Sequence, residues 1–228
     1  MKAAILAGGF GKRLKPLTDD KPKVLIEVGG LPILGWQVKW LAKHGVRDLV
    51  LCTGYLKEQI INYIGSGAKF GVRIGYAAED EPLGTAGALK NAAAFLRNGD
   101  VFLVLNGDVL TDLDPHKLAA AVGGPILGAI AVVPLRSPFG VVDVTRRGAI
   151  VGFREKPLLS EYWINAGIYC LRPPIFERLP AKGDIENATF PRLASSGQLK
   201  AVRYPAAAWR SIDSHKDIEE AEREFKVT

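Results

Sequence analysis

The chain has 228 residues, 48% of them hydrophobic and 24% charged. This mixture excludes an intrinsically disordered protein, and the length is enough to bury a stable core without disulfides. Lys and Arg residues number 30 against 24 Asp and Glu residues, which gives a formal net charge of +6. Such a surplus suits nucleic acid, acidic lipid or phosphorylated small molecules as partners, and composition alone does not choose among them.

The two cysteines, Cys52 and Cys170, exclude a disulfide-rich scaffold and a cysteine-rich zinc site. Each ends an apolar run typical of a strand, so we expect buried thiols in a reducing compartment. The longest apolar stretch, residues 126–133, lies between two prolines and is too short to cross a bilayer. Gly8 and Gly9 interrupt the N-terminal apolar run, which argues against a signal peptide. We therefore expect a soluble, cytoplasmic protein.

Short apolar runs alternate with longer amphipathic segments in the first half of the chain. The expected strands cover residues 2–6, 24–28, 48–52, 72–76 and 101–105, and the expected helices cover residues 32–43, 57–64 and 85–96. This alternation of strands and helices predicts a parallel, doubly wound sheet.

The pattern changes after residue 121. Four strand-like segments follow, at residues 126–133, 140–144, 149–153 and 165–171, and they indicate a mixed or antiparallel extension of the sheet. Helices are expected at residues 173–178, 187–194 and 214–225, with Ser214 as the N-cap of the last one. Because no linker, charge block or repeat interrupts the chain, we expect one continuous domain over residues 1–228.

A loop rich in glycine and basic residues, Leu6–Thr18, leaves the first strand. Ligands of open α/β sheets bind beyond the carboxyl ends of the strands, where glycines let backbone N–H groups approach phosphate oxygens. The loop is not a Walker A motif, because Arg13 stands where Ser or Thr is required, and Leu14 occupies the third glycine position of a dinucleotide fingerprint. A flexible surface turn is the alternative. Lys23 brings another cation to the same sheet edge, which favours phosphate binding.

Two further groups of polar residues are candidates for binding a metal ion and a sugar phosphate. Asp108 follows Asn106 and Gly107 at the end of an apolar strand, where a carboxylate suits Mg²⁺; the alternative is a turn capped by the aspartate. Glu155, Lys156 and Asn165 lie near the ends of later strands, where they could hydrogen-bond sugar hydroxyls and a sugar phosphate. For Glu155 and Lys156 the alternative is a solvated charge pair.

Together these segments resemble the sugar-1-phosphate nucleotidylyltransferases, also called nucleotide-sugar pyrophosphorylases. The matching segments follow the family's order over nearly the whole chain and cover residues 6–18, 22–23, 81–88, 104–109, 138–142, 153–157 and 165–169. The resemblance is closest to the mannose-1-phosphate guanylyltransferase branch, through its Pro-Leu-Gly-Thr-Ala-Gly and Leu-Asn-x-Asp-Val segments.

The resemblance implies a Rossmann-like, three-layer α/β/α sandwich with a mixed central sheet. It also implies an enzyme that joins an NTP, with GTP favoured, to a hexose 1-phosphate and releases pyrophosphate, with Mg²⁺ as cofactor. The attacking phosphate is already ionised, so the reaction needs positioning and charge neutralisation but neither a general base nor a covalent intermediate.

The resemblance assigns roles to individual residues. It implies catalytic roles for Arg13, Lys23 and Asp108. The residues that it implies for nucleotide binding are Leu6, Ala7, Gly8, Gly9, Gly11, Arg13, Lys23, Gly84, Thr85 and Asp108. Those that it implies for binding the sugar phosphate are Gly140, Glu155, Lys156 and Asn165.

The second metal ligand is where the sequence departs from the family. Many members carry an aspartate in a Trp-x-Asp-x-Gly segment, whereas here Ser211 stands at that position and Asp213 at the glycine. Side chains two residues apart on a strand share a face, so we predict that Asp213 joins Asp108 as a metal ligand. The alternative is that Asp213 caps the last helix and that Asp108 holds Mg²⁺ with the substrate phosphates.

Many relatives also carry a C-terminal left-handed β-helix. These 228 residues contain no hexapeptide repeat, so neither that domain nor an acyltransferase activity is expected. Base and sugar stay open: the alternatives are uridylyl, thymidylyl or cytidylyl transfer to glucose 1-phosphate, and a non-catalytic regulator that binds nucleotide sugars. Nucleic acid is disfavoured because the basic residues lack interleaved aromatics. No membrane partner is expected, and a homo-oligomer is left open.

The three histidines are scattered along the chain. His44 and His116 lie near expected helix ends, and His215 lies at the start of the last expected helix. We expect surface or capping roles for all three rather than catalysis.

Overall fold

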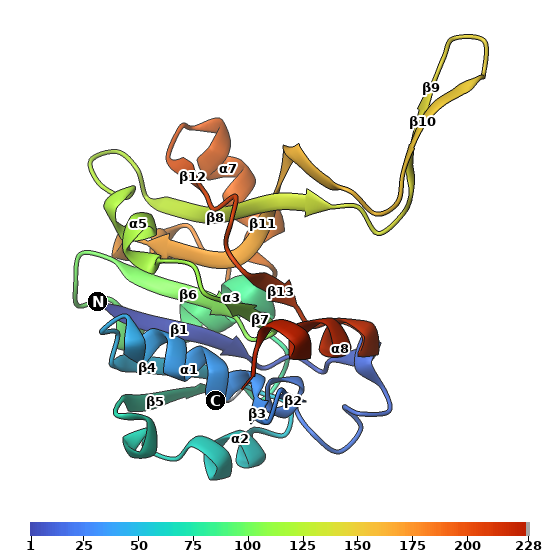
Figure 1. The fold of residues 1–228 in the computed structure, drawn as a ribbon. Coiled ribbons are helices and arrows are strands. Elements are labelled where there is room, and N and C mark those ends of the chain that lie inside the picture. The colour runs from blue at the N-terminus through green and yellow to red at the C-terminus, as the bar shows by residue number, and fades with distance from the viewer. Residues whose placement is uncertain (227–228) are drawn as a thin grey trace.

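A computed structural model describes residues 1–226, in which a seven-stranded mixed sheet forms the middle layer (Figure 1). Its strand order is β12-β8-β11-β6-β1-β4-β5. The strands are β1 (Lys2–Ala7), β4 (Asp48–Thr53), β5 (Arg73–Ala78), β6 (Phe102–Asn106), β8 (Gly128–Arg136), β11 (Leu158–Leu171) and β12 (Leu199–Arg203). β1, β4, β5 and β6 are parallel, whereas β11 runs antiparallel to both of its neighbours, β6 and β8. The parallel first half and the mixed extension are confirmed.

Helices cover both faces of this sheet. On one face lie α1 (Ile33–Lys43), α2 (Lys57–Ile64) and α5 (Pro115–Ala120), and on the other lie α3 (Gly84–Asn91), α4 (Ala93–Leu96), α6 (Ile185–Ala188) and α7 (Phe190–Ser195). Successive residues of a strand point to opposite faces, so Ala3 and Ile5 pack in one core and Ala4 in the other. The three-layer α/β/α sandwich is confirmed, and Cys52 and Cys170 are buried free thiols, as expected.

A third, smaller core lies beside the sandwich. It joins the last helix, α8 (His215–Glu224), to the hairpin of β2 (Glu27–Val28) and β3 (Leu31–Pro32). Next to it, β13 (Trp209–Ser211) pairs with β7 (Val109–Thr111), the short strand that follows β6. This pairing brings the end of the chain to the loop that carries Asp108. The short 3-10 helices are η1 (Lys12–Leu14), η2 (Lys23–Leu25), η3 (Ala68–Phe70) and η4 (Pro173–Glu177).

A two-stranded ribbon projects from the body of the molecule (Figure 1). It consists of β9 (Val141–Val144) and β10 (Ile150–Arg154), connects β8 to β11, and with its flanking residues 139–157 is called the arm below. Its apolar side chains are exposed, with Val151 and Phe153 at 69% and 66%. The arm therefore has no hydrophobic core of its own within the described residues.

The strand expected at residues 24–28 is wrong. Residues 23–25 form η2, and only Glu27 and Val28 pair, in the separate ribbon with β3. Val24, Ile26 and Val28 are buried all the same. Their alternation reflects a loop segment packed on the cores rather than a strand of the sheet.

Other boundaries also differ from the prediction. β11 begins at Leu158 rather than at residue 165, and the helix expected at 173–178 is the 3-10 helix η4. β8 continues through Pro134, which lies opposite Trp163 where the ladder shifts register, so the missing N–H disturbs little. The helix expected at 85–96 is divided at Ala92, whose backbone leaves helical geometry. The helix expected at 187–194 is also divided, because Pro191 cannot donate a helical hydrogen bond and α7 starts anew at Phe190.

None of the helices formed by residues 1–226 has the length and apolar character needed to cross a membrane.

Candidate active site

A pocket of about 400 Å³ opens at the carboxyl ends of β1 and β6. All ten residues predicted for nucleotide binding line it, although they come from four separate segments of the chain. They are Leu6, Ala7, Gly8, Gly9, Gly11, Arg13, Lys23, Gly84, Thr85 and Asp108. The structure thus brings the predicted residues together at the predicted sheet edge, and their individual roles stay predictions.

The glycine-rich loop is held in place rather than free. Gly11 has φ +61°, and a side chain there would lie 2.9 Å from the methyl group of Thr18. Thr18 is buried and its hydroxyl donates a hydrogen bond of 2.9 Å to the carbonyl oxygen of Gly11. A side chain at Gly8 would collide with Glu79, whose Oε1 lies 2.5 Å from the Cβ position. These contacts argue against the flexible surface turn.

Lys23 lies between two carboxylates at the rim of the pocket. Its Nζ contacts Oδ2 of Asp108 at 2.8 Å and Oδ1 of Asp213 at 2.7 Å, and its side chain is only 14% exposed. The guanidinium of Arg13 contacts the same Oδ1 of Asp213 at 2.8 Å. Two positive and two negative side chains therefore neutralise one another at the place where phosphates are expected.

The cations control the ionisation of Asp213. Burial alone would raise the pKa of this carboxyl, but Lys23, Arg13 and the hydroxyl of Ser211 outweigh it and hold the pKa below its usual range. Asp213 is therefore ionised at neutral pH. Because the ammonium of Lys23 already sits between Asp213 and Asp108, the two carboxylates fit a cation, and carboxylate oxygens are ligands that Mg²⁺ prefers.

The helix cap next to Asp213 is a different residue. Ser214 caps α8 in a capping box with Asp217, as predicted for Ser214, so the side chain of Asp213 is free to turn toward Lys23. β13 ends at Ser211, whose hydroxyl donates a hydrogen bond of 3.2 Å to Oδ2 of Asp213. The side chains of residues 211 and 213 thus lie next to each other, although Asp213 lies beyond the end of the strand.

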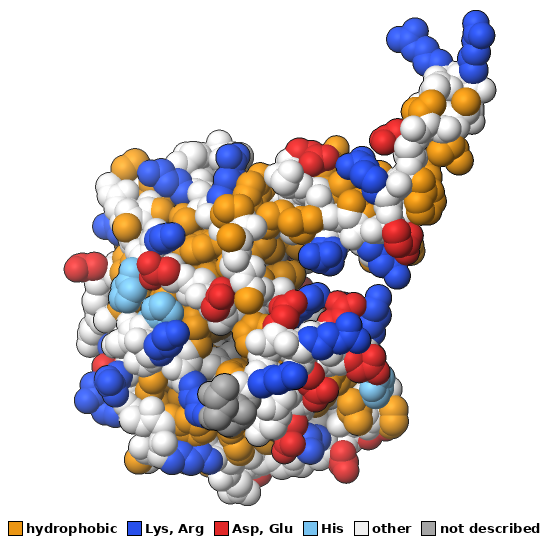
Figure 2. All heavy atoms as spheres, in the orientation of Figure 1, with side chains coloured by type: hydrophobic (Ala, Val, Ile, Leu, Met, Phe, Trp, Pro, Cys, Tyr) orange, Lys and Arg blue, Asp and Glu red, His pale blue; other side chains and the backbone are white. Residues whose placement is uncertain are grey.

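Three of the four residues predicted for the sugar phosphate lie at the base of the arm. A side chain at Gly140 would lie 3.0 Å from Oε2 of Glu155, and Lys156 Nζ lies 3.6 Å from Oε1 of Glu155. Lys156 has φ +45°, a strained conformation that proteins tend to keep at functional positions. None of the three lines the nucleotide pocket. Figure 2 shows a hollow between the base of the arm and the body.

That hollow connects the arm to the neighbourhood of Asp213. An open cavity of about 610 Å³ is lined by Lys156 on one side and by Arg210 and Ser211 on the other. A sugar phosphate bound there would lie between the arm and the segment that carries Asp213.

Asn165 lies on the body rather than on the arm. Its Nδ2 donates a hydrogen bond of 2.9 Å to the hydroxyl of Tyr169, and its Oδ1 accepts one from the N–H of Gly167. Gly167 packs against the side chain of Asn106, which lines the nucleotide pocket. Asn165 therefore lies beside that pocket, apart from the other three.

A hydrogen-bonded chain connects the two sides of the site. Thr85, in the nucleotide pocket, donates a hydrogen bond of 2.7 Å to Glu186, which accepts another of 3.0 Å from Tyr169. Tyr169 in turn accepts the hydrogen bond from Asn165. Burial raises the pKa of Tyr169, so its hydroxyl keeps its proton. The position of Asn165 is thus fixed relative to Thr85.

Two acidic residues of the pocket were not predicted. Glu79 lies at the end of β5, at the same sheet edge as the loop after β1, so its position after an expected strand was a usable signal. Burial raises its pKa, and within residues 1–226 its Oε2 is buried with no hydrogen-bond partner. Asp184 accepts a hydrogen bond from the N–H of Thr85, and no local pattern marked it.

A three-layer fold with a glycine-rich pocket and a lysine between two carboxylates at the edge of its sheet is the arrangement of a nucleotidyltransferase. Over residues 2–227 the chain matches the family described as nucleotidyl transferase, and it belongs to that family. The resemblance inferred from the sequence motifs is confirmed.

Relatives and solved structures agree with this family. The chain is 37% identical to the mannose-1-phosphate guanylyltransferase catalytic subunit beta of Dictyostelium discoideum and 40% identical to the mannose-1-phosphate guanyltransferase of Neurospora crassa. Both matches cover 96% of this chain, which spans 62% of the length of these relatives.

Among solved structures, HddC from Yersinia pseudotuberculosis in complex with GMP-PN matches with a TM-score of 0.79 and 29% identity over 99% of each chain. A putative glucose-1-phosphate thymidylyltransferase from Bacillus anthracis matches with a TM-score of 0.78 and 25% identity, over 100% of this chain and 97% of that one.

Proposed function

We propose that this protein is a sugar-1-phosphate nucleotidylyltransferase that transfers GMP from GTP to mannose 1-phosphate. The observation that carries the proposal is Lys23, held between Asp108 and Asp213 at the rim of the glycine-rich pocket. The names of the relatives from Dictyostelium and Neurospora support the choice of GTP and mannose 1-phosphate.

In this reaction a phosphate oxygen of the sugar phosphate attacks the α-phosphorus of GTP. A new P–O bond forms, the bond from the α-phosphorus to the bridging oxygen breaks, and pyrophosphate leaves with that oxygen and its electron pair. Such a displacement depends on positioning and on neutralising the charge that builds on the phosphates. We assign that neutralisation to Arg13 and Lys23, with the backbone N–H groups of the glycine-rich loop holding the triphosphate.

Asp108 and Asp213 are the ion-pair partners of these cations. They neutralise the charges of Lys23 and Arg13 in the structure. Both carboxylates would hold Mg²⁺, which supplies a counter-charge for the triphosphate and the leaving pyrophosphate. We assign the ammonium of Lys23 to the α-phosphate, where it would neutralise the charge that builds during the displacement. Asp108 and Asp213 would thus act as metal ligands, and in the structure they are the ion-pair partners of Lys23.

We assign the sugar phosphate to the open cavity beside the arm. Lys156 provides a positive charge at its edge, and Glu155 provides acceptors for sugar hydroxyls. Gly140 leaves room beside Phe153 and Glu155, because a Cβ there would lie 2.8 Å from the ring of Phe153 and 3.0 Å from Oε2 of Glu155. Asn165 approaches from the body and is positioned by Tyr169.

Glu79 is our candidate for recognising the base. Glu79 lines the pocket, and its buried Oε2 has no hydrogen-bond partner within the described part of the chain. Guanine offers two adjacent donors, N1–H and the N2 amino group, which a carboxylate can accept together. Uracil and thymine offer one N–H between two carbonyl oxygens, and a carboxylate repels those oxygens. Glu79 therefore favours guanine over either pyrimidine.

The test is a panel of each NTP with mannose 1-phosphate, glucose 1-phosphate and other hexose 1-phosphates, with pyrophosphate release as the readout. We expect the highest kcat/KM with GTP and mannose 1-phosphate. Preference for another pair would replace our choice of substrates by the uridylyl, thymidylyl or cytidylyl alternative. Tight binding of an NTP or a nucleotide sugar with no pyrophosphate release would favour a non-catalytic regulator and overturn the proposal.

A substitution at Glu79 tests whether this residue recognises the base. Glu79→Gln keeps the size of the side chain but places an amide donor where guanine also donates, so we expect the KM for GTP to rise by roughly tenfold or more. UTP should be used better than by the wild type. Glu81→Gln is the matched control, because Glu81 is exposed and pairs with Lys182 outside the pocket. Equal base preference in Glu79→Gln and wild type would remove Glu79 from base recognition.

We further propose that residues 1–228 work as one catalytic domain in the cytoplasm. The nucleotide pocket and the neighbouring cavity beside the arm draw on the whole length of the chain, from Leu6 to Glu224. The buried free thiols of Cys52 and Cys170 suit a reducing compartment. Size-exclusion chromatography with light scattering will measure whether the protein forms a homo-oligomer.

A further inference from the structure

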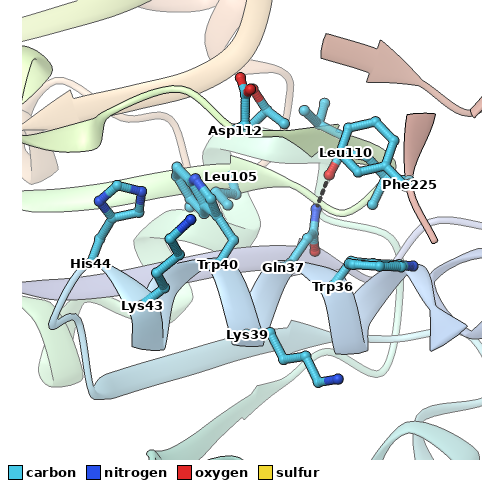
Figure 3. Close-up of a pocket in the computed structure, with 12 residues that line it drawn as sticks. Trp36, Gln37, Lys39, Trp40, Lys43, His44, Leu105, Leu110, Asp112 and Phe225 are labelled. Atoms are coloured by element: carbon cyan, nitrogen blue, oxygen red, sulfur yellow. Dashed lines mark hydrogen bonds between the residues drawn. The ribbon is translucent and has the colours of Figure 1, made fainter. Parts of the chain in front are cut away.

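Two of the three histidines, far apart in the sequence, come together with an aspartate on the surface. His44 follows the last turn of α1, and Asp114 and His116 lie at the start of α5. One nitrogen or oxygen donor atom from each of the three lies within 4.8 Å of the others. Figure 3 shows His44 at the end of α1, and Figure 2 shows a pair of histidine side chains side by side on the surface. None of the three residues lines the nucleotide pocket.

The imidazole rings are held in fixed orientations. The rings of His44 and His116 lie 5.9 Å apart, and Trp40 packs edge-on against His44 at 5.6 Å. Nε2 of His116 lies 3.2 Å from the carbonyl oxygen of His44. With its proton on Nε2, the His116 ring has a free lone pair on Nδ1. A hydrogen bond from one ring nitrogen to a backbone carbonyl is the usual support of a histidine that binds a metal through the other nitrogen.

Asp114 can cap its helix and bind a cation at the same time. Oδ1 of Asp114 accepts a hydrogen bond of 2.9 Å from the N–H of His116 and so caps α5. The second carboxylate oxygen is left for a cation.

We propose that His44, Asp114 and His116 form a Zn²⁺ site separate from the candidate active site. Two imidazoles and one carboxylate are a typical ligand set for zinc, with the fourth position of the tetrahedron open to water. Imidazole ligands favour zinc over the hard cations Mg²⁺ and Ca²⁺. The ion would connect the end of α1 to the start of α5 and so stabilise the junction between these two helices.

The test measures zinc binding to the full chain after removal of metals with a chelator. Titration against a chromophoric chelator should show one Zn²⁺ site, and His116→Ala should weaken it by about tenfold or more. Asp114→Asn should also weaken it while keeping a good N-cap for α5. His215→Ala is the matched control, because His215 is exposed and lies outside the cluster. All variants are made with Asp108→Asn, which removes one carboxylate of the other candidate cation site.

Two further readouts separate binding at this site from a general effect on folding. Co²⁺ in place of Zn²⁺ should give the visible absorption of a tetrahedral site, and His116→Ala should lose it. Zn²⁺ should raise the Tm of the parent protein and leave the Tm of His116→Ala unchanged. Equal zinc affinity in His116→Ala and its parent, an equal loss in His215→Ala, or no binding in the parent would each overturn the proposal. The readouts do not depend on transferase activity, so they are independent of the proposed function.

Discussion

The two halves of the candidate active site differ in how firmly the surrounding protein holds their charged side chains. On the nucleotide side, Lys23 is 14% exposed and is held by two carboxylates. On the sugar-phosphate side, Glu155 and Lys156 are 63% and 48% exposed and contact each other at 3.6 Å. The cations of the nucleotide half are held by the protein's own carboxylates, whereas the charged side chains of the sugar-phosphate half are largely exposed.

The supporting structure explains this difference. The nucleotide loop follows β1, which pairs on both sides within the seven-stranded sheet and is covered by helices. The arm is a two-stranded ribbon whose side chains Val151 and Phe153 are mostly exposed, and an isolated hairpin is only marginally stable. A fixed half and an adaptable half predict that substitutions on the two sides affect different kinetic constants.

The largest expected effect is that of Lys23→Ala. Removing the cation that we assign to the α-phosphate should lower kcat by roughly 10³-fold, since its charge acts mainly in the transition state, and should lower Tm by only a few degrees, because two partly buried ion pairs are lost. Pyrophosphate release measures kcat, and thermal unfolding measures Tm. Lys21→Ala, a substitution of an exposed lysine two residues away, should leave both unchanged. A rate in Lys23→Ala near that of the wild type would mean that the fixed half is not the catalytic one.

Asp213→Asn should come next, with a loss of roughly 10²-fold in kcat, because it removes one carboxylate from the proposed metal site. Ser211 lies within 3.2 Å of Asp213, so adding Ser211→Asp to this variant should restore a large part of the activity. Activity is measured over a range of Mg²⁺ concentrations. Failure of the second substitution to restore any activity would show that only position 213 can present the carboxylate.

On the adaptable half we expect a smaller and more selective effect. Glu155→Gln should raise the KM for the sugar phosphate by about tenfold and leave the KM for the NTP unchanged, because a hydrogen bond to a charged group is lost on one side only. Steady-state kinetics with each substrate varied in turn measures both constants. Glu161→Gln, a change of an exposed residue on β11, is the control. An equal rise in both constants would contradict a division of the site into two halves.

The smallest expected effect concerns stability and pH. Because the folded-state pKa of Asp213 is lowered, this carboxylate stabilises the folded protein above its ordinary pKa, and the contribution is lost as the pH falls through the lowered value. At pH 7, Asp213→Asn should unfold with a free energy about 1 kcal/mol lower than the wild type. The difference should shrink below about pH 4. Urea unfolding at several pH values measures it, and a constant difference would contradict the ion-pair origin.

The nucleotide half could be predicted from the sequence because its signals are local. Glycines and Arg13 follow directly after an apolar strand, and Asp108 follows another, so their meeting at one edge comes from the topology of parallel strands. The nearness of Asp213 to Ser211 was also predicted, although Asp213 follows the strand rather than lying on it, and its role as a metal ligand stays a prediction.

Other contacts depend on tertiary packing that no local pattern records. Asp184 and Glu186 reach Thr85 from a distant segment, and His44 reaches His116 only because α1 and α5 lie on the same face of the sheet. Similarly, the alternation of Val24, Ile26 and Val28 is the same for a strand and for a packed loop. Only the strand pairing of the folded protein distinguishes a strand of the central sheet from a packed loop.

The position of Asp213 along the chain has a consequence for protein synthesis. Arg13 and Lys23 leave the ribosome early, and the carboxylate that contacts both of them leaves it late. A nascent chain therefore carries an incompletely neutralised basic loop until β13 pairs with β7. The site is complete only after residue 213 has been made, so a ribosome-bound fragment ending before that residue would expose the loop without the carboxylate that contacts its cations.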